Sequence, residues 1–364
     1  MITRQIQLAE ERSTALPPHS STHTLRALIT GASGFIGGHL AQQLVESGWW
    51  DVRGLVRSQS PRSRLEQLSV PMQTGDVTDL ASVRAAVQSA DVVFHVAGVV
   101  KALNYENFRR VNETGVENVL RACAERETPP TVVIVSSIAA SGPATLDRPR
   151  QEADPANPVS SYGRSKRGGE LIAESYADRL PISIVRPPIV FGEHDTAMLA
   201  LFKPIVKHRF HVVPGFVTRR VSMIHAADLS RLIVAAAERG QRLSADPTVR
   251  RDTAPGYYFA GSPEQPTLGE MGELIGKAGG REGVKIYHAP NFVAWGVGLT
   301  GELISRIKRS PVIVNCDKIR ESLAGSWTCS TARAVHELDF QVETPLFDRL
   351  RQTADFYRSA GWLD

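Results

Sequence analysis

The sequence predicts an α/β protein in which a parallel, doubly wound sheet carries a smaller C-terminal lobe. Two features support this prediction. Short apolar runs alternate with stretches of helical pattern, and such alternation is typical of parallel sheets joined by helical crossovers. A glycine-rich segment directly follows the first run, at the end of a strand where sheets of this kind bind ligands. The predicted strands are residues 25–30, 52–56, 70–74, 92–96, 131–136 and 182–186, with a further strand at 256–261.

The glycine-rich segment has the sequence context of a dinucleotide-binding turn. It links the strand Leu25–Thr30 to a helical pattern that ends before Gly48. Gly31 would allow a tight turn, Gly34 the close approach of a pyrophosphate, and Gly37 close packing of the helix. The N–H groups and the positive dipole at the start of that helix would attract the phosphates. The residues expected to bind the cofactor here are Gly31, Ser33, Gly34, Phe35, Ile36 and Gly37.

A second set of polar residues predicts proton transfer to and from a carbonyl oxygen. Tyr162 and Lys166 are four residues apart, which places both side chains on one face of a helix. A nearby ammonium favours the ionised form of a phenol, so Lys166 would lower the pKa of Tyr162. The pair Ser136 and Ser137, at the end of a predicted strand, supplies a hydroxyl. The structural alternatives are a glycine-rich loop without a ligand, a strand-end serine turn and a helix tyrosine without a catalytic role.

These motifs resemble the extended short-chain dehydrogenase/reductase superfamily, in its NAD-dependent epimerase/dehydratase family. The resemblance covers roughly residues 24 to 364. It implies a Rossmann-type sheet, a smaller C-terminal substrate-binding lobe and a Ser-Tyr-Lys site. The further segments that carry it are Gly75–Asp79, Asp91–Gly98, Val111–Leu120 and Arg186–Gly192.

The resemblance also implies a role for each site residue. Tyr162 would be the general acid in carbonyl reduction and the base in alcohol oxidation, while Lys166 would hold the nicotinamide ribose. Ser137, rather than Ser136, would hydrogen-bond the substrate oxygen. Asn112 would support Lys166 through backbone or water contacts. The remaining cofactor contacts that the resemblance implies are Asp76, Val77, Val96, Ala97, Gly98, Pro187 and Ile189, together with Tyr162 and Lys166.

The end of the second predicted strand favours NADP(H) over NAD. A carboxylate there would bond the ribose hydroxyls of NAD and repel a 2′-phosphate, yet the chain has Arg57 and Ser58. A guanidinium is a planar donor fork suited to phosphate, and Arg62 and Arg64 follow closely in the sequence. The segment resembles that of dihydroflavonol-reductase-type enzymes, which implies NADP. A solvated basic loop with NAD bound is the alternative.

The residue types that follow Ser137 differ between the subfamilies of this family, so they indicate which subfamily the chain resembles. Ile138-Ala139 stands where dehydratases have an Asp-Glu pair, and Ser141-Gly142 where epimerases usually have Tyr-Gly. The pattern resembles 3β-hydroxysteroid dehydrogenase-like enzymes, as do residues 256–267 and 327–363. It implies an oxidoreductase that interconverts a secondary alcohol and a ketone on a largely apolar substrate, whether sterol-like, polycyclic or long-chain β-keto. The alternatives are a nucleotide-sugar epimerase with tightly bound NAD and a non-catalytic NAD(P)-sensing protein.

The chain divides into three predicted parts. Residues 1–23 would be a flexible N-terminal extension, 24–192 the NAD(P)-binding domain with a return segment at about 221–262, and 193–364 an interleaved substrate-binding lobe. Residues 193–220 have a loop-like pattern. From Asn291 to Lys308, apolar residues at helical spacing predict a helix that either covers the substrate pocket or contacts a membrane surface.

Composition narrows the classes of partner. The chain is 42% hydrophobic with a formal net charge of +4 and no basic stripe, so we expect no nucleic-acid partner. Its three cysteines lack metal-ligand spacing, which predicts no metal site and a reducing compartment. The first residues lack the apolar core of a signal peptide, and no apolar run is long enough for a transmembrane helix, so we expect a cytoplasmic protein. The resemblance implies a homodimer paired through residues 100–125 and 161–178.

Overall fold

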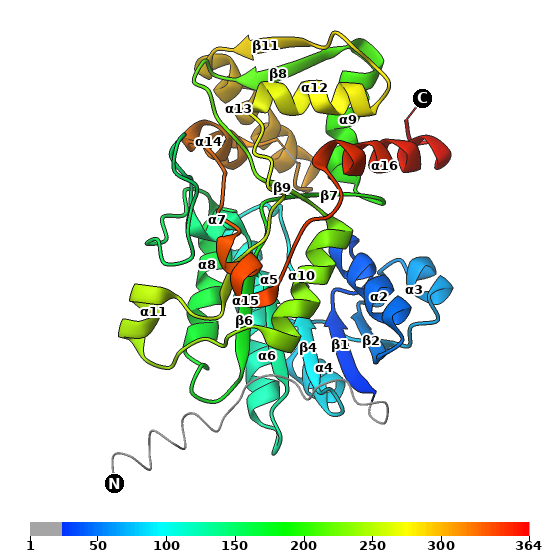
Figure 1. Ribbon diagram of the computed structural model, residues 1–364, viewed down its shortest axis with the longest axis vertical. Coiled ribbons are helices and arrows are strands. Elements are labelled where there is room, and N and C mark those ends of the chain that lie inside the picture. Colours follow the sequence, from blue (N-terminus) through cyan, green and yellow to red (C-terminus); the bar gives the residue numbers. More distant parts are fainter. Residues whose placement is uncertain (1–23, 313, 364) are drawn as a thin grey trace.

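The computed structural model describes residues 24–312 and 314–363, so the extension predicted for residues 1–23 lies outside the described residues. Its centre is a seven-stranded parallel sheet in the order β10-β6-β5-β4-β1-β2-β3 (Figure 1). The predicted α/β class with a parallel sheet is confirmed. The strands are β1 (Leu25–Thr30), β2 (Trp50–Val56), β3 (Met72–Thr74), β4 (Val92–His95), β5 (Thr131–Val135), β6 (Ile182–Arg186) and β10 (Tyr257–Phe259).

The strand order reverses beside β1, which pairs with β2 on one side and β4 on the other. Crossovers therefore leave β1 and β4 in opposite directions, and the crevice between them is where doubly wound sheets bind ligands. Every residue of β4, β5 and β6 is buried, because helices cover both faces of the sheet.

Two helical layers enclose the sheet. On one face, α2 (Phe35–Ser47), α10 (Ala226–Arg239) and α15 (Ala332–Leu338) pack in one apolar core. On the other, α4 (Leu80–Val87), α6 (Thr114–Ala124) and α8 (Ser161–Glu174) form a second core. The remaining helices around the sheet are α3 (Ser63–Gln67), α5 (Tyr105–Asn112), α7 (Ile138–Ser141) and α11 (Pro247–Thr253).

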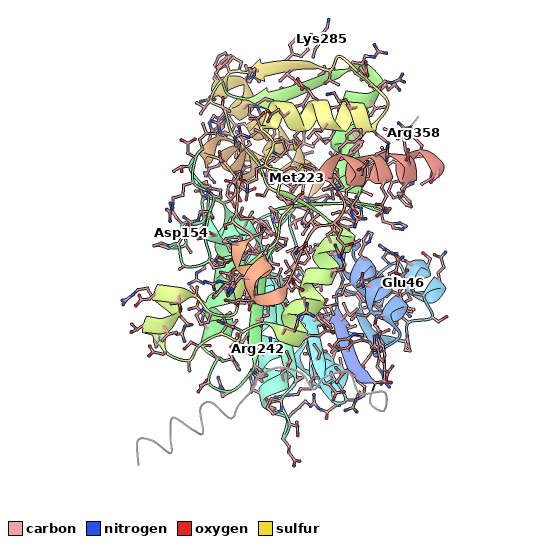
Figure 2. All side chains as sticks on the ribbon, in the orientation of Figure 1. Glu46, Asp154, Met223, Arg242, Lys285 and Arg358 are labelled. Carbon is pink, nitrogen blue, oxygen red and sulfur yellow. The ribbon has the colours of Figure 1, made fainter. Side chains whose placement is uncertain are left out.

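A second lobe lies beyond the carboxyl ends of the strands (Figure 1). Its parallel pair β8–β11 packs with α9 and α12, and α16 completes a third apolar core. The pair β7–β9 joins this lobe to the sheet; Met223 of β9 is fully buried where the two parts meet (Figure 2). The elements are β7 (Ile189–Phe191), α9 (Thr196–His208), β8 (Phe210–Pro214), β9 (Met223–His225), α12 (Leu268–Ala278), β11 (Lys285–Ala289), α13 (Asn291–Lys308), α14 (Cys316–Ala324) and α16 (Leu346–Ser359).

The sequence predicted a loop at residues 193–220. This prediction is wrong, because the segment contains α9 and β8. Asp195 caps α9 by accepting hydrogen bonds from the backbone N–H groups of Ala197 and Met198. Buried residues then recur at helical spacing, and they include Phe202 and Ile205. Lys203, Lys207 and His208 of α9 are exposed, whereas His211 and Arg219 further along the segment are buried.

Candidate active site

The turn between β1 and α2 has the close packing that its glycines predict. Gly31 has a φ of +71°, and a Cβ placed on it would lie 2.8 Å from the backbone of Ala97. A Cβ on Gly37 would overlap the carbonyl oxygen of Gly31. Gly34 is the N-cap of α2 and has no side chain to cap the helix. The N–H groups of the first turn, from Phe35 onward, are therefore positioned to receive a phosphate, and the residues fit a dinucleotide.

The turn that follows β4 is fixed against this glycine turn. The Thr30 hydroxyl accepts a hydrogen bond from the Ala97 N–H at 3.3 Å and lies 2.8 Å from His95 Nδ1. Asn112 accepts from the Val99 N–H at 2.9 Å and donates to the Val99 carbonyl at 3.0 Å. Residues 96–98, predicted to contact the cofactor, are thus held at the switch point of the sheet.

Ser137, Tyr162 and Lys166 come together at the end of β5 and the start of α8. Ser137 caps α7 by accepting from the Ala139 N–H at 3.1 Å, and it lines the same cavity as Tyr162. One turn along α8, Lys166 Nζ donates to the Val135 carbonyl at 2.8 Å. The predicted helical spacing of Tyr162 and Lys166 is confirmed.

Burial acts in opposite directions on the phenol and the ammonium. It raises the pKa of Tyr162 to about 12, although the Ser137 hydrogen bond favours the ionised form. It lowers the pKa of Lys166 to about 8, against the attraction of Glu170. At neutral pH the site therefore holds a protonated phenol, which can act as an acid, beside a lysine that is mostly charged.

Asn112 reaches helix α8 through Ser165. Its side-chain nitrogen donates to Ser165 Oγ at 3.0 Å, and this hydroxyl donates to the Tyr162 carbonyl at 2.8 Å. Gly98 lies between Asn112 and Lys166, since a Cβ there would be 3.2 Å from Asn112 Oδ1 and 3.7 Å from Lys166 Nζ. The asparagine thus ties α5 to α8 and to the turn after β4.

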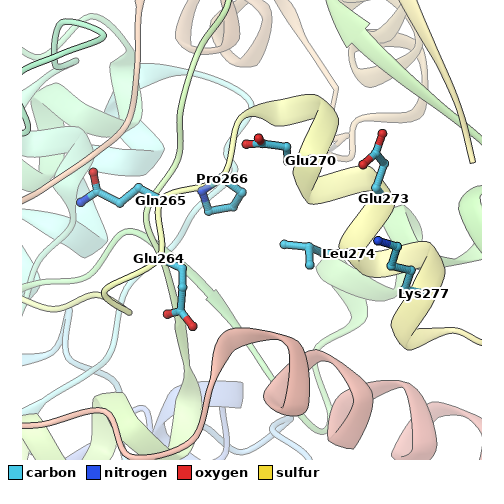
Figure 3. Close-up of a pocket in the computed structure, with 7 residues that line it drawn as sticks. All are labelled: Glu264, Gln265, Pro266, Glu270, Glu273, Leu274 and Lys277. Atoms are coloured by element: carbon cyan, nitrogen blue, oxygen red, sulfur yellow. The ribbon is translucent and has the colours of Figure 1, made fainter.

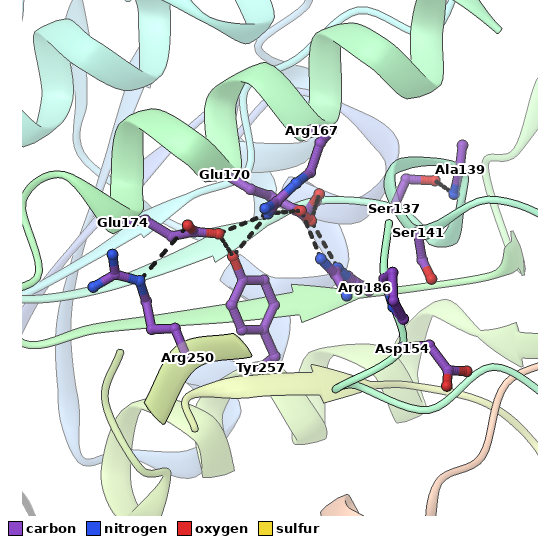
Figure 4. A network of polar contacts seen from close by, with 12 residues as sticks. Ser137, Ala139, Ser141, Asp154, Arg167, Glu170, Glu174, Arg186, Arg250 and Tyr257 are labelled. Carbon is purple, nitrogen blue, oxygen red and sulfur yellow. Dashed lines mark hydrogen bonds and ion pairs between the residues drawn. The ribbon is translucent and has the colours of Figure 1, made fainter. Parts of the chain in front are cut away.

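A buried charge network behind α8 was not predicted (Figure 4). Arg186 donates to both oxygens of Glu170, at 2.8 and 2.7 Å, and its guanidinium lies 4.3 Å from the centre of the Tyr257 ring. Arg167 also reaches Glu170, at 3.1 Å. Ser136 donates to Glu170 at 2.6 Å. Ser136 therefore belongs to this network, while Ser137 lines the cavity beside Tyr162.

The residues proposed to select the cofactor lie at the end of β2. Arg57 and Ser58 are exposed, and Ser58 donates to Gln59 at 3.0 Å. Arg62 donates to Thr74, and Arg64 lies against α2. Of the three arginines, Arg57 is thus the most accessible to a phosphate. Near the expected adenine position, Asp76 accepts from the Thr78 N–H and hydroxyl, and the Val77 carbonyl accepts from Asn118.

A cavity of about 420 Å³ begins at the Ser137 and Tyr162 hydroxyls. Apolar side chains from the sheet side and the lobe form much of its wall, among them Val100, Phe108, Ile138, Pro188, Ile189, Val190, Val221, Leu268 and Trp327. Its polar wall comes from α14 and nearby residues, namely Lys101, Arg219, Asn315, Asp317, Lys318, Glu321 and Ser322. A separate hollow over α12 is lined by neither Ser137 nor Tyr162 (Figure 3).

The helix expected at residues 291–308 exists as α13, but its predicted role as the pocket cover is wrong. None of the residues that line the cavity belongs to α13. The buried residues of this helix are Ala294, Gly298 and Ser305, and a Cβ on Gly298 would contact Ile319 of α14 at 2.8 Å. The small residues face inward, so α14 covers the cavity and the large apolar side chains of α13 point outward.

Comparison with known proteins identifies the family. The model of the NAD dependent epimerase/dehydratase family matches residues 27–248, and the chain belongs to this family. A ceramide reductase of Caulobacter vibrioides is 33% identical over 343 residues, covering 92% of this chain and 95% of the relative. A 4-hydroxy-2-methyl-3-oxo-4-farnesyl-3,4-dihydroquinoline-1-oxide ketoreductase of Stigmatella aurantiaca is 30% identical over 222 residues, covering 59% and 65%. A 3β-hydroxysteroid dehydrogenase/Δ5→4-isomerase of Mycobacterium tuberculosis is 26% identical over 288 residues, covering 76% and 75%.

Solved structures support the fold. The UDP-glucuronic acid 4-epimerase of Bacillus cereus, solved with UDP-glucuronic acid and NAD, has a TM-score of 0.71 at 20% identity and covers 92% of this chain and 100% of its own. The dTDP-glucose 4,6-dehydratase of Streptomyces venezuelae has a TM-score of 0.72 at 19% identity, covering 93% and 99%. The fold is that of the extended short-chain dehydrogenases/reductases, and with the family it establishes the chain as an NAD(P)-dependent enzyme of this type.

Proposed function

We propose that this chain is an NADPH-dependent ketone reductase that acts on a long-chain lipid of the ceramide type. The cavity carries the proposal, because its apolar wall leads directly to the Ser137 and Tyr162 hydroxyls. The ceramide reductase relative, which matches almost the whole chain, supports the lipid class. The polar wall formed by α14 would face the amide and hydroxyl groups near the reacting carbon, and the apolar wall would take the hydrocarbon.

The residues of the chain would hold the ketone and deliver a proton. Bound NADPH would supply the hydride. Ser137 Oγ–H would donate to the ketone oxygen and stabilise the negative charge that develops there. Tyr162, protonated at neutral pH, would transfer its proton to that oxygen and yield the secondary alcohol. Lys166 and the turn at residues 96–98 would orient the nicotinamide ribose and favour the phenolate that is left.

The choice of NADPH rests on Arg57 and Ser58. Both side chains are exposed at the end of β2, where the 2′-position of the adenosine ribose would lie. A guanidinium can bond a phosphate with two parallel N–H groups, and the adjacent hydroxyl can donate a third.

Product analysis with a panel of substrates tests the proposed function. Purified enzyme and NADPH would be incubated with a long-chain 3-oxo lipid of the ceramide type, a 3-oxosteroid and UDP-glucose. We expect NADPH to be consumed with the lipid, and Tyr162→Phe to lower kcat by at least about 100-fold without weakening NADPH binding. Turnover of UDP-glucose without net cofactor consumption would instead identify an epimerase.

We further propose that α13 brings the enzyme to a lipid surface. Its outward side chains Phe292, Leu299, Leu303 and Ile307 are 76%, 61%, 58% and 74% exposed. Arg306, Lys308 and Arg309 at the end of the helix would attract anionic headgroups. In the described part of the chain, no helix is long and apolar enough to cross a bilayer. The occupant proposed for this face is therefore the surface of an anionic bilayer.

A further inference from the structure

The cavity proposed to hold the ketone contains a buried guanidinium without a carboxylate partner. Arg219, in the segment between β8 and β9, lines this cavity and is only 7% exposed. Its Nη1 donates to the carbonyls of Pro214 and Val217 at 3.0 and 3.1 Å, and its Nη2 to the Leu323 carbonyl at 3.2 Å. A guanidinium has five N–H groups, and the one on Nε has no acceptor among the described residues. A buried donor in this state is costly unless a ligand supplies the acceptor.

The Nε atom belongs to the edge of the guanidinium that holds carboxylates elsewhere in this chain. Arg186 donates from Nε and Nη2 to the two oxygens of Glu170. Arg349 uses the same two atoms to hold Asp228. At Arg219 this edge has a backbone carbonyl on Nη2 and nothing on Nε. Burial lowers the pKa of Arg219, and no carboxylate of the described residues opposes this shift.

The two carboxylates in the cavity wall are already committed to other donors. Both lie on α14, and each accepts hydrogen bonds from the start of α8 and from a cation of its own helix. The pairs are Asp317 with the Ser161 N–H at 2.7 Å and with Arg320 at 2.8 Å, and Glu321 with the Ser160 hydroxyl and with Lys318 at 2.9 Å. Their negative charges are therefore balanced within α14, and that of Arg219 is not.

The groups of the polar wall that remain for a ligand are donors. Lys101 is an exposed residue of the wall and has no ion-pair partner in the described part of the chain. Asn315 uses its side-chain oxygen to accept from the Lys318 N–H at 2.9 Å, so its amide N–H groups are left. The wall thus offers N–H groups and positive charge, which are complementary to an oxyanion.

We infer that Arg219, assisted by Lys101, binds an oxyanion of the substrate, so that the lipid reduced in this cavity carries a phosphate or a carboxylate on its head. The inference rests on the proposed function in taking this cavity as the substrate site. The hydrocarbon would lie on the apolar wall, and the anion would fix the position of the ketone relative to Ser137 and Tyr162. A neutral head would leave the Arg219 edge without its partner and should bind more weakly.

Calorimetric titration of the enzyme with a matched pair of amides tests the site. N-decanoylglycine and N-decanoylglycinamide share the chain and the amide, and differ in a carboxylate against an uncharged group. At neutral pH and monomeric concentrations, we expect the carboxylate to bind at least about 10-fold more tightly, because a charge-assisted hydrogen bond to a buried group is gained. Monodecyl phosphate, titrated alongside, shows which of the two oxyanions is preferred.

Three variants locate the binding. Arg219→Met removes the N–H groups and should abolish most of the preference, while Arg219→Lys, which keeps the charge, should retain part of it. Arg306→Met makes the same change on the exposed face of α13 and should leave the preference intact, which separates the cavity from that surface.

The wild-type comparison decides the matter even where Arg219→Met does not fold. Equal affinities for the two amides, tighter binding of the neutral one, or a preference that survives in folded Arg219→Met would overturn the oxyanion site. Because the titration involves no turnover, its outcome is distinct from that of the reductase assay. An enzyme that reduced no ketone would contradict the proposed function and leave a measured oxyanion preference standing.

Discussion

Burial shifts the pKa values of the polar groups proposed to act on a ketone. Tyr162 and Lys166 lie one helical turn apart, yet burial raises the pKa of the first and lowers that of the second, because it disfavours whichever form is charged. The pair therefore starts as an acid with a supporting cation. At neutral pH this state suits reduction of a ketone, in which the phenol gives up a proton.

The first prediction for a single residue concerns Arg57. Replacing it with alanine should weaken NADPH binding by about 10- to 100-fold, because a charge-assisted hydrogen bond to the 2′-phosphate is lost. NADH, which has no such phosphate, should bind equally well to both proteins. Calorimetric titration with each cofactor measures the difference, and Arg62→Ala is the matched control, since Arg62 already donates to Thr74. Equal NADPH affinities, or NAD that survives purification, would contradict the choice of NADPH.

Helix α8 organises the site because successive turns of one of its faces have different partners. Its first turn carries Tyr162 and is held by α14, and Lys166 follows one turn later. One turn further along the same face, Glu170 bonds Arg186 on β6 and Ser136 at the end of β5 (Figure 4). The buried ion pair thus connects α8 to these two strands.

Glu170→Gln tests this connection. The change leaves the buried Arg186 guanidinium without its carboxylate, and we expect the free energy of unfolding to fall by about 3–5 kcal/mol. Urea unfolding at neutral pH measures it. The double variant Glu170→Gln/Arg186→Met should recover part of the loss, while Glu125→Gln, in the exposed pair with Arg84, should have little effect. A Glu170→Gln protein as stable as wild type would show that the network does not hold α8.

A second prediction for a secondary-structure element concerns the outward face of helix α13. Leu303→Glu/Ile307→Glu should abolish co-sedimentation with vesicles of phosphatidylcholine and phosphatidylglycerol, because charged side chains cannot enter the apolar boundary of the bilayer. Leu171→Glu, at a 52% exposed position on α8, should sediment as wild type does. If the wild-type enzyme stays in solution with these vesicles, α13 is not a membrane contact.

The elements also show where local sequence stops being informative. The strands of the sheet could be predicted to within about two residues, because strands buried on both faces read as continuous apolar runs. Helix α9 was missed because basic residues and Pro204 mask its buried face. Asp317 and Glu321 could not be assigned to the site at all. Their partners lie more than 150 residues earlier in the chain, and no local pattern predicts which helix end a distant carboxylate will cap.

At the scale of the whole molecule, the sheet and the second lobe meet around buried histidines. His39 on α2 lies 2.9 Å from the Glu193 carbonyl, and His225 before α10 lies 3.2 Å from the Glu193 carboxylate. Gln352 of α16 donates to the same carboxylate at 2.6 Å. Glu193 therefore links the helical layer that contains α2 and α10 to α16 of the second lobe.

Two buried histidines, His39 at this junction and His95 at the end of β4, predict that acid destabilises the fold. Burial lowers the pKa of His39 to about 4 and that of His95 to about 3, so both rings are neutral in the folded state. Unfolded histidines take up protons near pH 6.5, and stability is lost as the pH falls from there through the folded pKa values. The free energy of unfolding should drop by a few kcal/mol between neutral pH and about pH 4.

Urea unfolding at a series of pH values measures this loss. His39→Gln, which can still donate to the Glu193 carbonyl, should show a shallower pH dependence, while the exposed His208→Gln serves as the control. An identical slope in His39→Gln and wild type would remove His39 from the explanation.

Transfer of deuterium from NADPH that carries deuterium at both C4 hydrogen positions tests the central claim most directly. The enzyme would be incubated with the labelled cofactor and a long-chain 3-oxo lipid, and the product analysed by mass spectrometry. We predict one deuterium on the new carbinol carbon and one NADP⁺ formed per alcohol. A product without deuterium, or a reaction supported by NAD that never leaves the protein, would contradict the assignment of an exchangeable-cofactor reductase.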